Sequence, residues 1–290
     1  MSSLTVMTQH WRLDRTYRST AGAVRWTTFG EDGAPPLVLL HGTPFSSYIW
    51  RDVARALAGR FQVYVWDMPG YGDSEMATGQ DVSLAKQAEV LTELFAHWGL
   101  DTREPTVAAH DFGGYVALRA HLVHGLRYRR LALLDAVVLT GWGSPTYRLL
   151  GSHPDVFGRL PAGLHRALVT EYIGSGSHPG LHPAALERIV APWCTEEGQA
   201  AFYRQIEQNE LDLTDDLEGR LGELTVPTLV CWGAEDTWLP VAWAHRLAAA
   251  VPGARLHLFE GAGHLVQEDA PAELAAVLAA FAGADGSGPA

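Results

Sequence analysis

The segment from Thr106 to Arg119, Thr-Val-Ala-Ala-His-Asp-Phe-Gly-Gly-Tyr-Val-Ala-Leu-Arg, constrains the fold more than any other part of the chain. Its first part has the apolar character of a short buried strand, its second part has the apolar spacing of a helix, and only a tight turn separates them. The small residues Ala109 and Gly113 flank Asp111, so strand and helix can approach closely at the turn. The pattern predicts that Asp111 stands on a strained turn and presents its side chain.

A carboxylate on such a turn has a definite chemistry. With an ordinary pKa of about 3.9 it is ionised at neutral pH, whereas a serine hydroxyl needs a neighbouring base before it can attack. Asp111 could therefore attack a substrate carbon directly and form an alkyl ester. The alternative interpretation is a plain strand-to-helix turn in which Asp111 caps the helix N-terminus.

The composition excludes several classes of function. The 290 residues carry a formal net charge of −12 without a cluster of Lys and Arg, which argues against a nucleic-acid partner. No run of about eighteen apolar residues could cross a membrane, and the first ten residues lack the pattern of a secretory leader. The two cysteines, Cys194 and Cys231, cannot build a disulfide framework. We expect a cytoplasmic protein that binds neither nucleic acid nor membrane.

Strand and helix patterns alternate on both sides of a different, helical middle part. Val24 to Phe29 and Pro36 to Leu40 predict an opening hairpin, and later apolar strands alternate with helices. From Val137 to Gly222 these strands give way to short helical pieces broken by Gly and Pro. The pattern predicts an α/β fold, with a mostly parallel central sheet flanked by helices and an inserted helical cap. The expected boundaries are core 1–136, cap 137–222, core 223–283 and a flexible tail 284–290.

Two further loops carry side chains suited to act with Asp111. Asp236 and His264 each follow an apolar strand of the second core part, and the carboxyl ends of parallel strands share one edge of a sheet. We therefore expect all three residues at that edge. His264 alone could be an ordinary turn histidine between two glycines. Asp135, which ends the strand before the cap, is the alternative acid for His264, and we prefer Asp236.

The order nucleophile, acid, histidine on these loops resembles the α/β-hydrolase superfamily. His110-Asp-Phe-Gly-Gly114 is similar to the nucleophile turn of its aspartate group, which contains epoxide hydrolases, haloalkane dehalogenases and fluoroacetate dehalogenases. The resemblance extends from about Ala23 to Phe281 and implies the α/β-hydrolase fold. It also implies that the backbone N–H groups of Thr43 and Phe112 stabilise an oxyanion.

Differences from the family patterns bear on the substrate. Haloalkane dehalogenases typically hold the halide with a Trp after the nucleophile and often an Asn after a His-Gly pair, positions that are Phe112 and Thr43 here. Fluoroacetate dehalogenases carry arginines beside the nucleophile, and Phe112 and Tyr115 offer none. Epoxide hydrolases protonate the epoxide oxygen from cap tyrosines, and Tyr203-Arg204 resembles the Tyr-Arg pair that holds one of them. Tyr203 could equally be a packing residue of a cap helix.

Other aromatic residues of the cap are candidates for substrate contacts. Tyr147 and Tyr172 are candidates for the second tyrosine. Trp142 and Trp193 could contact the substrate or donate to a halide. Together these side chains predict an apolar pocket between cap and core.

No metal or cofactor is expected. His178 and His182 stand beside Gly and Pro, so they would not share a helix face as a pair of metal ligands. The glycine-rich stretch from Asp67 to Ser74 lacks the lysine of a phosphate-binding loop.

These features predict a cofactor-independent hydrolase that uses a small apolar organic substrate and water. Asp111 forms an ester, Tyr203 or another cap donor assists the leaving oxygen, and His264, oriented by Asp236, activates water. Epoxide hydrolysis is the preferred reaction. Haloalkane or haloacid dehalogenation is one alternative, and a non-catalytic ligand-binding homologue is another. The substrate and the oligomeric state have no signal in the sequence.

Overall fold

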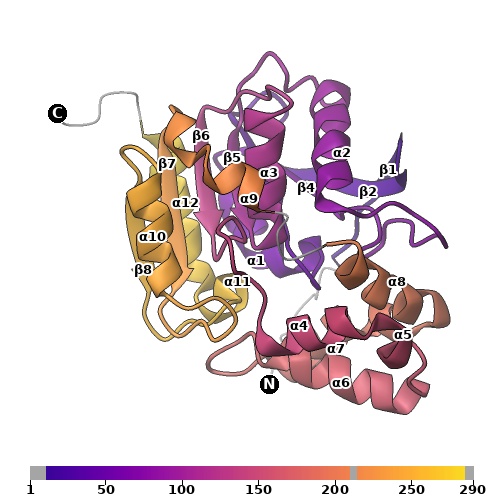
Figure 1. Ribbon diagram of the computed structural model, residues 1–290. Coiled ribbons are helices and arrows are strands. Elements are labelled where there is room, and N and C mark those ends of the chain that lie inside the picture. The colour runs from indigo at the N-terminus through magenta and orange to yellow at the C-terminus, as the bar shows by residue number, and fades with distance from the viewer. Residues whose placement is uncertain (1–10, 210–213, 285–290) are drawn as a thin grey trace, which may run out of the picture.

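The computed structural model describes residues 11–209 and 214–284, and an eight-stranded sheet runs through its centre (Figure 1). The strand order is β1-β2-β4-β3-β5-β6-β7-β8. β2 is antiparallel to both β1 and β4, whereas all pairs from β4 to β8 are parallel. The strands are β1 (Arg15–Ser19), β2 (Gly22–Phe29), β3 (Pro36–Leu40), β4 (Gln62–Trp66), β5 (Thr106–His110), β6 (Arg130–Leu134), β7 (Thr228–Gly233) and β8 (Arg255–Phe259).

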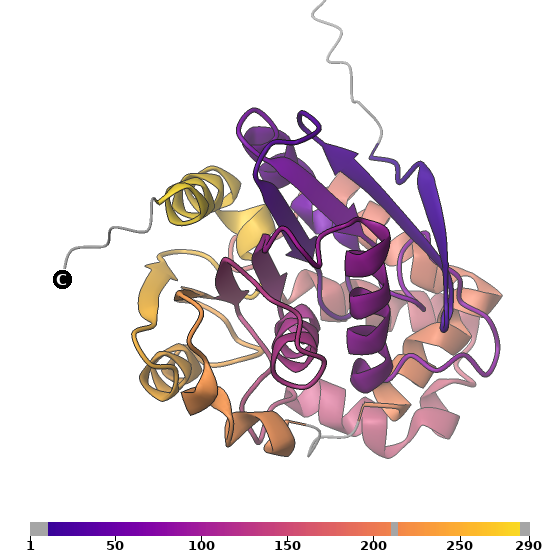
Figure 2. The ribbon, with the colours of Figure 1, turned by 90° about the horizontal axis from the view of Figure 1, so that it is seen from above.

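Helices cover both faces of this sheet. Figure 2 shows α1 (Arg51–Leu57) and α12 (Pro271–Gly283) on one face, and α2 (Leu84–His97), α3 (Phe112–Leu122) and α10 (Ala242–Ala250) on the other. Two short elements, η1 (Ser47–Trp50) and α11 (Val266–Asp269), precede α1 and α12. Because both faces are covered, the central strands can be apolar at nearly every position, as β3 is. The mostly parallel sheet flanked by helices is confirmed.

The predicted opening hairpin is wrong. β2 pairs with β1 and with β4, and β4 lies between β2 and β3. The burial of the strands gives the reason: β3 is buried on both faces and takes parallel neighbours on both sides, β4 and β5, whereas β2 is only partly buried and occupies the antiparallel margin.

The chain between β6 and β7 is helical wherever the structure describes regular elements. These are α4 (Pro145–Ser152), α5 (Pro154–Phe157), α6 (Ala162–Gly174), α7 (Pro183–Val190), η2 (Ala191–Cys194), α8 (Glu196–Glu207), α9 (Asp215–Glu218) and η3 (Leu221–Glu223). α4 to α8 form a layer at one edge of the sheet, the lower edge in Figure 1. We call this layer the cap.

The last two elements of the predicted cap range pack on the core instead. Asp216 of α9 forms an ion pair with Arg119 of α3 at 2.6 Å. Arg220, which precedes η3, donates to the carbonyl of Leu122 at 3.0 Å. The cap layer therefore ends before α9, and the chain is already back on the core ahead of Gly222.

Two expectations concern the ends of the chain. The stretch examined for a leader, residues 1–10, and residues 285–290 of the expected tail lie outside the described residues. Within the described ranges, no helix combines the length and the apolar character needed to cross a membrane.

Two cap side chains hold the loop that follows β3. Trp193 of η2 donates its Nε1–H to the carbonyl of Pro44 at 2.7 Å. Gln205 of α8 accepts, through its Oε1, the hydroxyl protons of Thr43 at 2.9 Å and Tyr71 at 3.1 Å. These bonds are buried, so they tie the position of the cap to the conformation of this loop.

We predict that Trp193→Phe lowers the free energy of unfolding by about 1–3 kcal/mol more than Trp50→Phe, because it removes the donor to a buried carbonyl. Trp50 is a matched control, since it is equally buried but its Nε1 has no partner among the described residues. Urea unfolding followed by circular dichroism gives both values. Equal losses in the two variants would mean that the bond to Pro44 adds nothing beyond packing.

Candidate active site

Asp111 connects β5 to α3 in a backbone conformation that residues with a side chain rarely adopt, with φ 50° and ψ −118°. Its N–H donates to the carbonyl of Leu134 at 3.0 Å, and its carbonyl accepts the N–H of Val137 at 3.1 Å. Gly113 lets α3 start close to the neighbouring loop, because a Cβ there would lie 2.7 Å from the carbonyl of His41. A polar residue whose rare backbone conformation is maintained by the surrounding hydrogen bonds is typical of functional sites.

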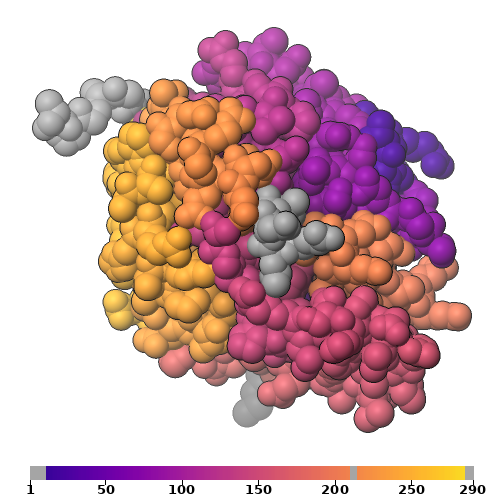
Figure 3. Space-filling view, in the orientation of Figure 1, coloured from indigo at the N-terminus to yellow at the C-terminus, as the bar shows by residue number. Residues whose placement is uncertain are grey.

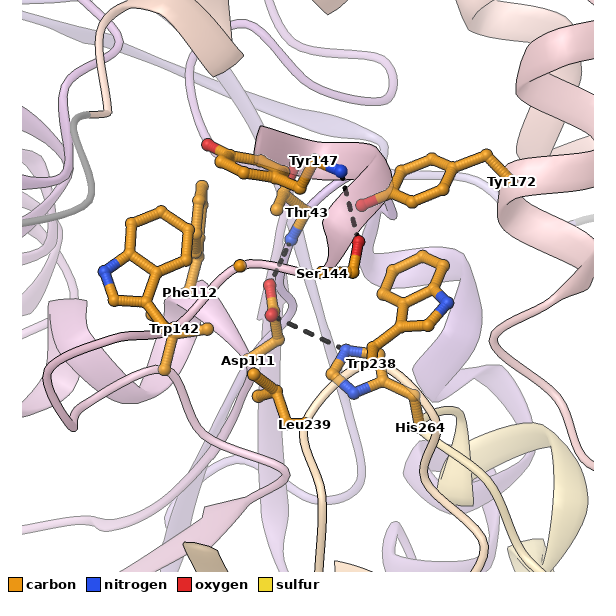
Figure 4. A pocket seen from close by; sticks show the side chains of 12 residues that line it. Thr43, Asp111, Phe112, Trp142, Ser144, Tyr147, Tyr172, Trp238, Leu239 and His264 are labelled. Atoms are coloured by element: carbon orange, nitrogen blue, oxygen red, sulfur yellow. Dashed lines mark hydrogen bonds and ion pairs between the residues drawn. The ribbon is translucent and has the colours of Figure 1, made fainter. Parts of the chain in front are cut away.

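The Asp111 carboxylate is held from two sides (Figure 4). The Thr43 N–H donates to Oδ1 at 2.7 Å, and Nε2 of His264 lies 3.5 Å from Oδ2. Gly42 permits this approach, since a Cβ there would lie 2.3 Å from Oδ1. The Phe112 N–H is the first amide of α3 and has no partner within the helix. One carboxylate oxygen is thus fixed by an amide, and the other faces the imidazole.

Asp236, rather than Asp135, contacts His264. Oδ2 of Asp236 lies 2.9 Å from Nδ1 of His264, and Oδ1 accepts the N–H groups of Trp238 at 2.7 Å and Leu239 at 3.0 Å. Asp135 instead accepts the N–H of Gly233 at 2.8 Å. The three loops named in the sequence analysis therefore meet at one edge of the sheet, and the preferred acid is the one in contact with the imidazole.

The buried charges determine the protonation of His264. Burial lowers its pKa, but Asp236 and Asp111 outweigh that effect and keep the pKa well above its ordinary value. His264 is therefore an imidazolium while Asp111 is ionised. Burial lowers the pKa of His41 to about 4 and that of His110 to about 3, so these neighbours are neutral.

A small cavity lies over Asp111, between core and cap. Its wall is mainly apolar and aromatic, and none of the described residues that line it is a Lys or an Arg. The lining residues are Thr43, Asp111, Phe112, Val137, Trp142, Gly143, Ser144, Tyr147, Tyr172, Trp238, Leu239 and His264.

Three aromatic side chains that carry hydrogen-bond donors line this cavity, Tyr147 and Tyr172 from the cap and Trp142 from the loop before α4. Figure 4 shows the Tyr172 hydroxyl directed into the space above Asp111. The Tyr172 ring stacks on that of Trp238, with 4.5 Å between the ring centroids. The Tyr147 hydroxyl and the Trp142 Nε1 are buried without a partner among the described residues. Burial raises the pKa of both tyrosines, so both remain protonated and can donate.

Residues 37–277 match the model of the alpha/beta hydrolase family. The chain belongs to this family. An α/β hydrolase fold protein from Burkholderia ambifaria is 40% identical and has a TM-score of 0.88, with 92% of this chain and 97% of that chain covered. Haloalkane dehalogenase 2 of Mycobacterium tuberculosis is 28% identical over 279 residues, which is 91% of this chain and 93% of that protein. The structure of the epoxide hydrolase CorEH, at 23% identity, has a TM-score of 0.77 and covers 92% of this chain and 97% of its own.

These findings confirm the α/β-hydrolase fold predicted from the sequence. Haloalkane dehalogenase 2 is a sequence relative of this α/β hydrolase, and the epoxide hydrolase CorEH shares its fold.

The prediction that Tyr203 faces Asp111 is wrong. Its hydroxyl lies 2.9 Å from Nδ1 of His165 inside the cap, and Tyr203 does not line the cavity. The rotation of α8 explains this, because Gln205 points to the core and a residue two positions earlier on a helix lies on nearly the opposite side. The interaction with His165 gives Tyr203 the packing role that the sequence analysis left open.

Trp193 is also removed from the set of substrate contacts. Its Nε1–H is taken by the carbonyl of Pro44, and the residue does not line the cavity. Trp142, Tyr147 and Tyr172 do line it.

Sequence reasoning missed several lining residues of this α/β hydrolase. Trp238 and Leu239 follow Asp236 closely, and the same loop that donates two amides to Asp236 forms one wall of the cavity. Their position directly after the acid is a signal that could have found them. Ser144 could have been found from the Ser-Pro helix start, since it caps α4 by accepting the N–H of Tyr147.

The site also contains a cluster that could suggest a metal ion. Ligand atoms of Asp135, Asp236 and His264 lie within 4.8 Å of one another. Both oxygens of Asp236 already accept N–H donors, and Nδ1 of His264 is one of those donors. We therefore assign these three side chains to the charge network around His264.

We predict that Gly42→Ala displaces the Thr43 N–H from Asp111, since the new methyl group would overlap the carboxylate. Hydrolytic turnover should fall by roughly 10²–10³-fold, as is usual when one oxyanion donor is lost. Gly59→Ala is the control, because a Cβ there meets nothing within 4 Å. A crystal structure and steady-state rates of both variants check this. Unchanged turnover in Gly42→Ala would show that the Thr43 amide is dispensable.

Proposed function

We propose that this α/β hydrolase is a cofactor-independent hydrolase that forms an ester between Asp111 and a small neutral epoxide. The observation that carries the proposal is the arrangement of the Asp111 carboxylate, with Oδ1 held by the Thr43 N–H and Oδ2 toward His264 under an apolar cavity. An ionised carboxylate in this position can attack carbon without a base.

In the first step an Asp111 oxygen attacks a ring carbon of the epoxide and the carbon–oxygen bond of the ring breaks. The released oxygen needs a proton, and the Tyr172 hydroxyl, which is directed into the cavity, is the first candidate donor. Tyr147, with its unpartnered hydroxyl, is the second candidate donor. The product is a hydroxyalkyl ester of Asp111.

Ester formation changes the charge that His264 experiences. Asp111 and Asp236 both raise the pKa of His264, and the ester is neutral, so the contribution of Asp111 is lost. The imidazolium can then give its proton to the Tyr172 phenolate left by the first step, which restores that hydroxyl, and the neutral imidazole can act as a general base. His264 takes a proton from water, the water attacks the ester carbonyl, and the Thr43 and Phe112 amides stabilise the oxyanion. Collapse releases the diol and restores the Asp111 carboxylate.

The chemistry of the pocket favours a neutral epoxide over the other leaving groups. A haloacid would bring a carboxylate next to Asp111, and no Lys or Arg is present among the described residues that line the cavity. A halide would need side-chain N–H donors beside the nucleophile. The position after Asp111 is Phe112, whose ring has none, and in Figure 4 the indole nitrogen of Trp142 lies on the side of its ring away from Asp111.

Haloalkane dehalogenation is the second candidate function. It is favoured by the unpartnered Nε1 of Trp142 in the cavity wall, which a rotated indole could direct to a halide. A non-catalytic binding protein is the third, and the occupied positions of Asp111, Asp236 and His264 argue against it. A paired screen of epoxides and haloalkanes separates the three, because they yield diols, halide ions, or no product.

We predict that Tyr172→Phe slows ester formation from an epoxide by roughly 10²–10⁴-fold, the usual loss when a general acid is removed, or by less if Tyr147 shares the proton transfer. Tyr203→Phe removes the same atom from a tyrosine that faces away from the cavity. It should leave the rate of ester formation unchanged. Rapid-quench measurement of the ester in both variants tests this assignment. If Tyr203→Phe formed the ester slowly and Tyr172→Phe formed it at the wild-type rate, Tyr203 and not Tyr172 would be the proton donor.

We predict that His264→Gln stops the second step and accumulates the ester, because Asp111 needs no base to attack. Mass spectrometry should find the mass of the epoxide added to the peptide that contains Asp111. After many turnovers in ¹⁸O-water, the wild-type protein should carry label in the Asp111 carboxylate. Asp111→Ala is the control and should abolish both signals. If wild type consumes a substrate but neither adduct nor label is found at Asp111, water attacks directly and the proposed nucleophile is wrong.

A further inference from the structure

A second carboxyl group, that of Asp135, is buried behind the Asp236–His264 pair. Asp135 is wholly buried, with a backbone φ of 41° that residues other than glycine rarely adopt. Its own N–H donates to the carbonyl of Cys231 at 3.1 Å, which fixes it beside β7. It is not needed to orient His264, because Asp236 already does so.

The two oxygens of Asp135 differ in their surroundings. Oδ1 accepts the N–H of Gly233 at 2.8 Å, whereas Oδ2 has no hydrogen-bond partner among the described residues although it is buried. A buried oxygen that no donor reaches is rare in folded proteins. It can be satisfied in one other way, by carrying a proton and donating it.

Asp236 offers the acceptor for such a proton. A carboxylate has about four acceptor positions on its two oxygens. Three of them on Asp236 are filled, by the amides of Trp238 and Leu239 and by Nδ1 of His264. A carboxyl oxygen of Asp135 lies within 4.8 Å of a carboxylate oxygen of Asp236 and of a ring nitrogen of His264.

Charge counting leads to the same result. Asp111, Asp236 and the imidazolium of His264 together have a net charge of −1, and ionised Asp135 would make it −2 in a buried site. The charged groups that act most strongly on Asp135 are Asp236 and His264, and the buried thiol of Cys231 beside it brings no positive charge. An unpaired buried anion costs far more than a neutral acid with a hydrogen bond.

We propose that Asp135 is a neutral carboxylic acid that donates a hydrogen bond to Asp236 and thereby acts as a positioning residue for the Asp236–His264 pair. Burial, with a further contribution from Asp236, raises the pKa of Asp135 well above its ordinary value, in agreement with the geometry. The role in catalysis rests on the proposed function. Because only Asp236 of the two acids behind His264 is negatively charged, and Asp135 is neutral, His264 can lose its proton once Asp111 is esterified.

The state of Asp135 can be tested without substrate by comparing two substitutions that make the same chemical change. Asp135→Asn replaces a neutral donor with another, so the imidazole of His264, followed by NMR in ¹⁵N-histidine-labelled protein, should titrate as in wild type. Asp236→Asn removes an ionised partner and should lower the pKa of His264 by roughly 1–3 units. A similar lowering in Asp135→Asn would mean that Asp135 is ionised, and would overturn the proposal.

A second measurement does not require a variant to fold. The infrared spectrum of wild type at neutral pH should contain the carbonyl band of a buried protonated carboxylic acid, and labelling with ¹³C-aspartate should shift it. Burial raises the pKa of Asp67 to about 6, so Asp67 contributes to such a band only under more acidic conditions. Absence of a shifting band at neutral pH would overturn the proposal.

The positioning role has its own readout in the hydrolysis of the ester. Asp135→Val keeps a side chain of similar volume but has no donor, and it should slow ester hydrolysis by roughly 10–100-fold, the equivalent of one hydrogen bond to a charged group. Asp135→Asn should restore the wild-type rate and its pH dependence. Equal impairment in both variants would contradict the positioning role. If the NMR and infrared results hold but no ester forms in any variant, the proposed function fails and the protonation of Asp135 stands.

Discussion

The structure depends on how a buried carboxylate, that of Asp111, is held in place. Its backbone is held in a strained conformation by bonds to the ends of neighbouring strands, and its side chain lies between one amide and one imidazolium. Each partner brings its own requirement. The Thr43 amide must be held by its loop, and the His264 charge must be balanced by Asp236.

The cap takes part in meeting them. Gln205 and Trp193 reach from the cap to Thr43 and Pro44, so the loop that presents the oxyanion amide is held from above as well as by the core. The cap also supplies Tyr147 and Tyr172 to the cavity wall. Cap position, oxyanion geometry and donor placement are therefore linked, and a change in the seating of the cap would alter all three.

The balance of charges explains how His264 can be an imidazolium before the ester forms and a general base afterwards. Asp111 and Asp236 both favour the imidazolium, and only Asp111 changes its charge during the proposed reaction. Because Asp135 is neutral, Asp236 is the one of these three acids that is still negatively charged beside His264 after ester formation, and the imidazolium can then lose its proton. The apolar cavity strengthens these effects, because charges interact more strongly where water is excluded.

The sequence by itself determined the features that local patterns encode. The small residues around Asp111 predicted the strained turn, the alternation of strands and helices predicted the covered parallel sheet, and loop positions placed Asp236 and His264 at its carboxyl edge. Those loops do meet in the structure, because parallel strands align their carboxyl ends.

Only the tertiary structure decided the contacts that depend on long-range pairing and on side-chain direction. β4 lies between β2 and β3 in the sheet. This order depends on which strands are buried on both faces and so take a strand on each side. Tyr203 faces His165 because the rotation of α8 points Gln205 at the core, and a Tyr-Arg motif carries no information on that rotation. Asp135 and Asp236 are equivalent in sequence terms, since each follows a buried strand. Their roles differ because the imidazole lies 2.9 Å from Asp236, whereas Asp135 is wholly buried and one of its oxygens has no donor among the residues that the structure describes.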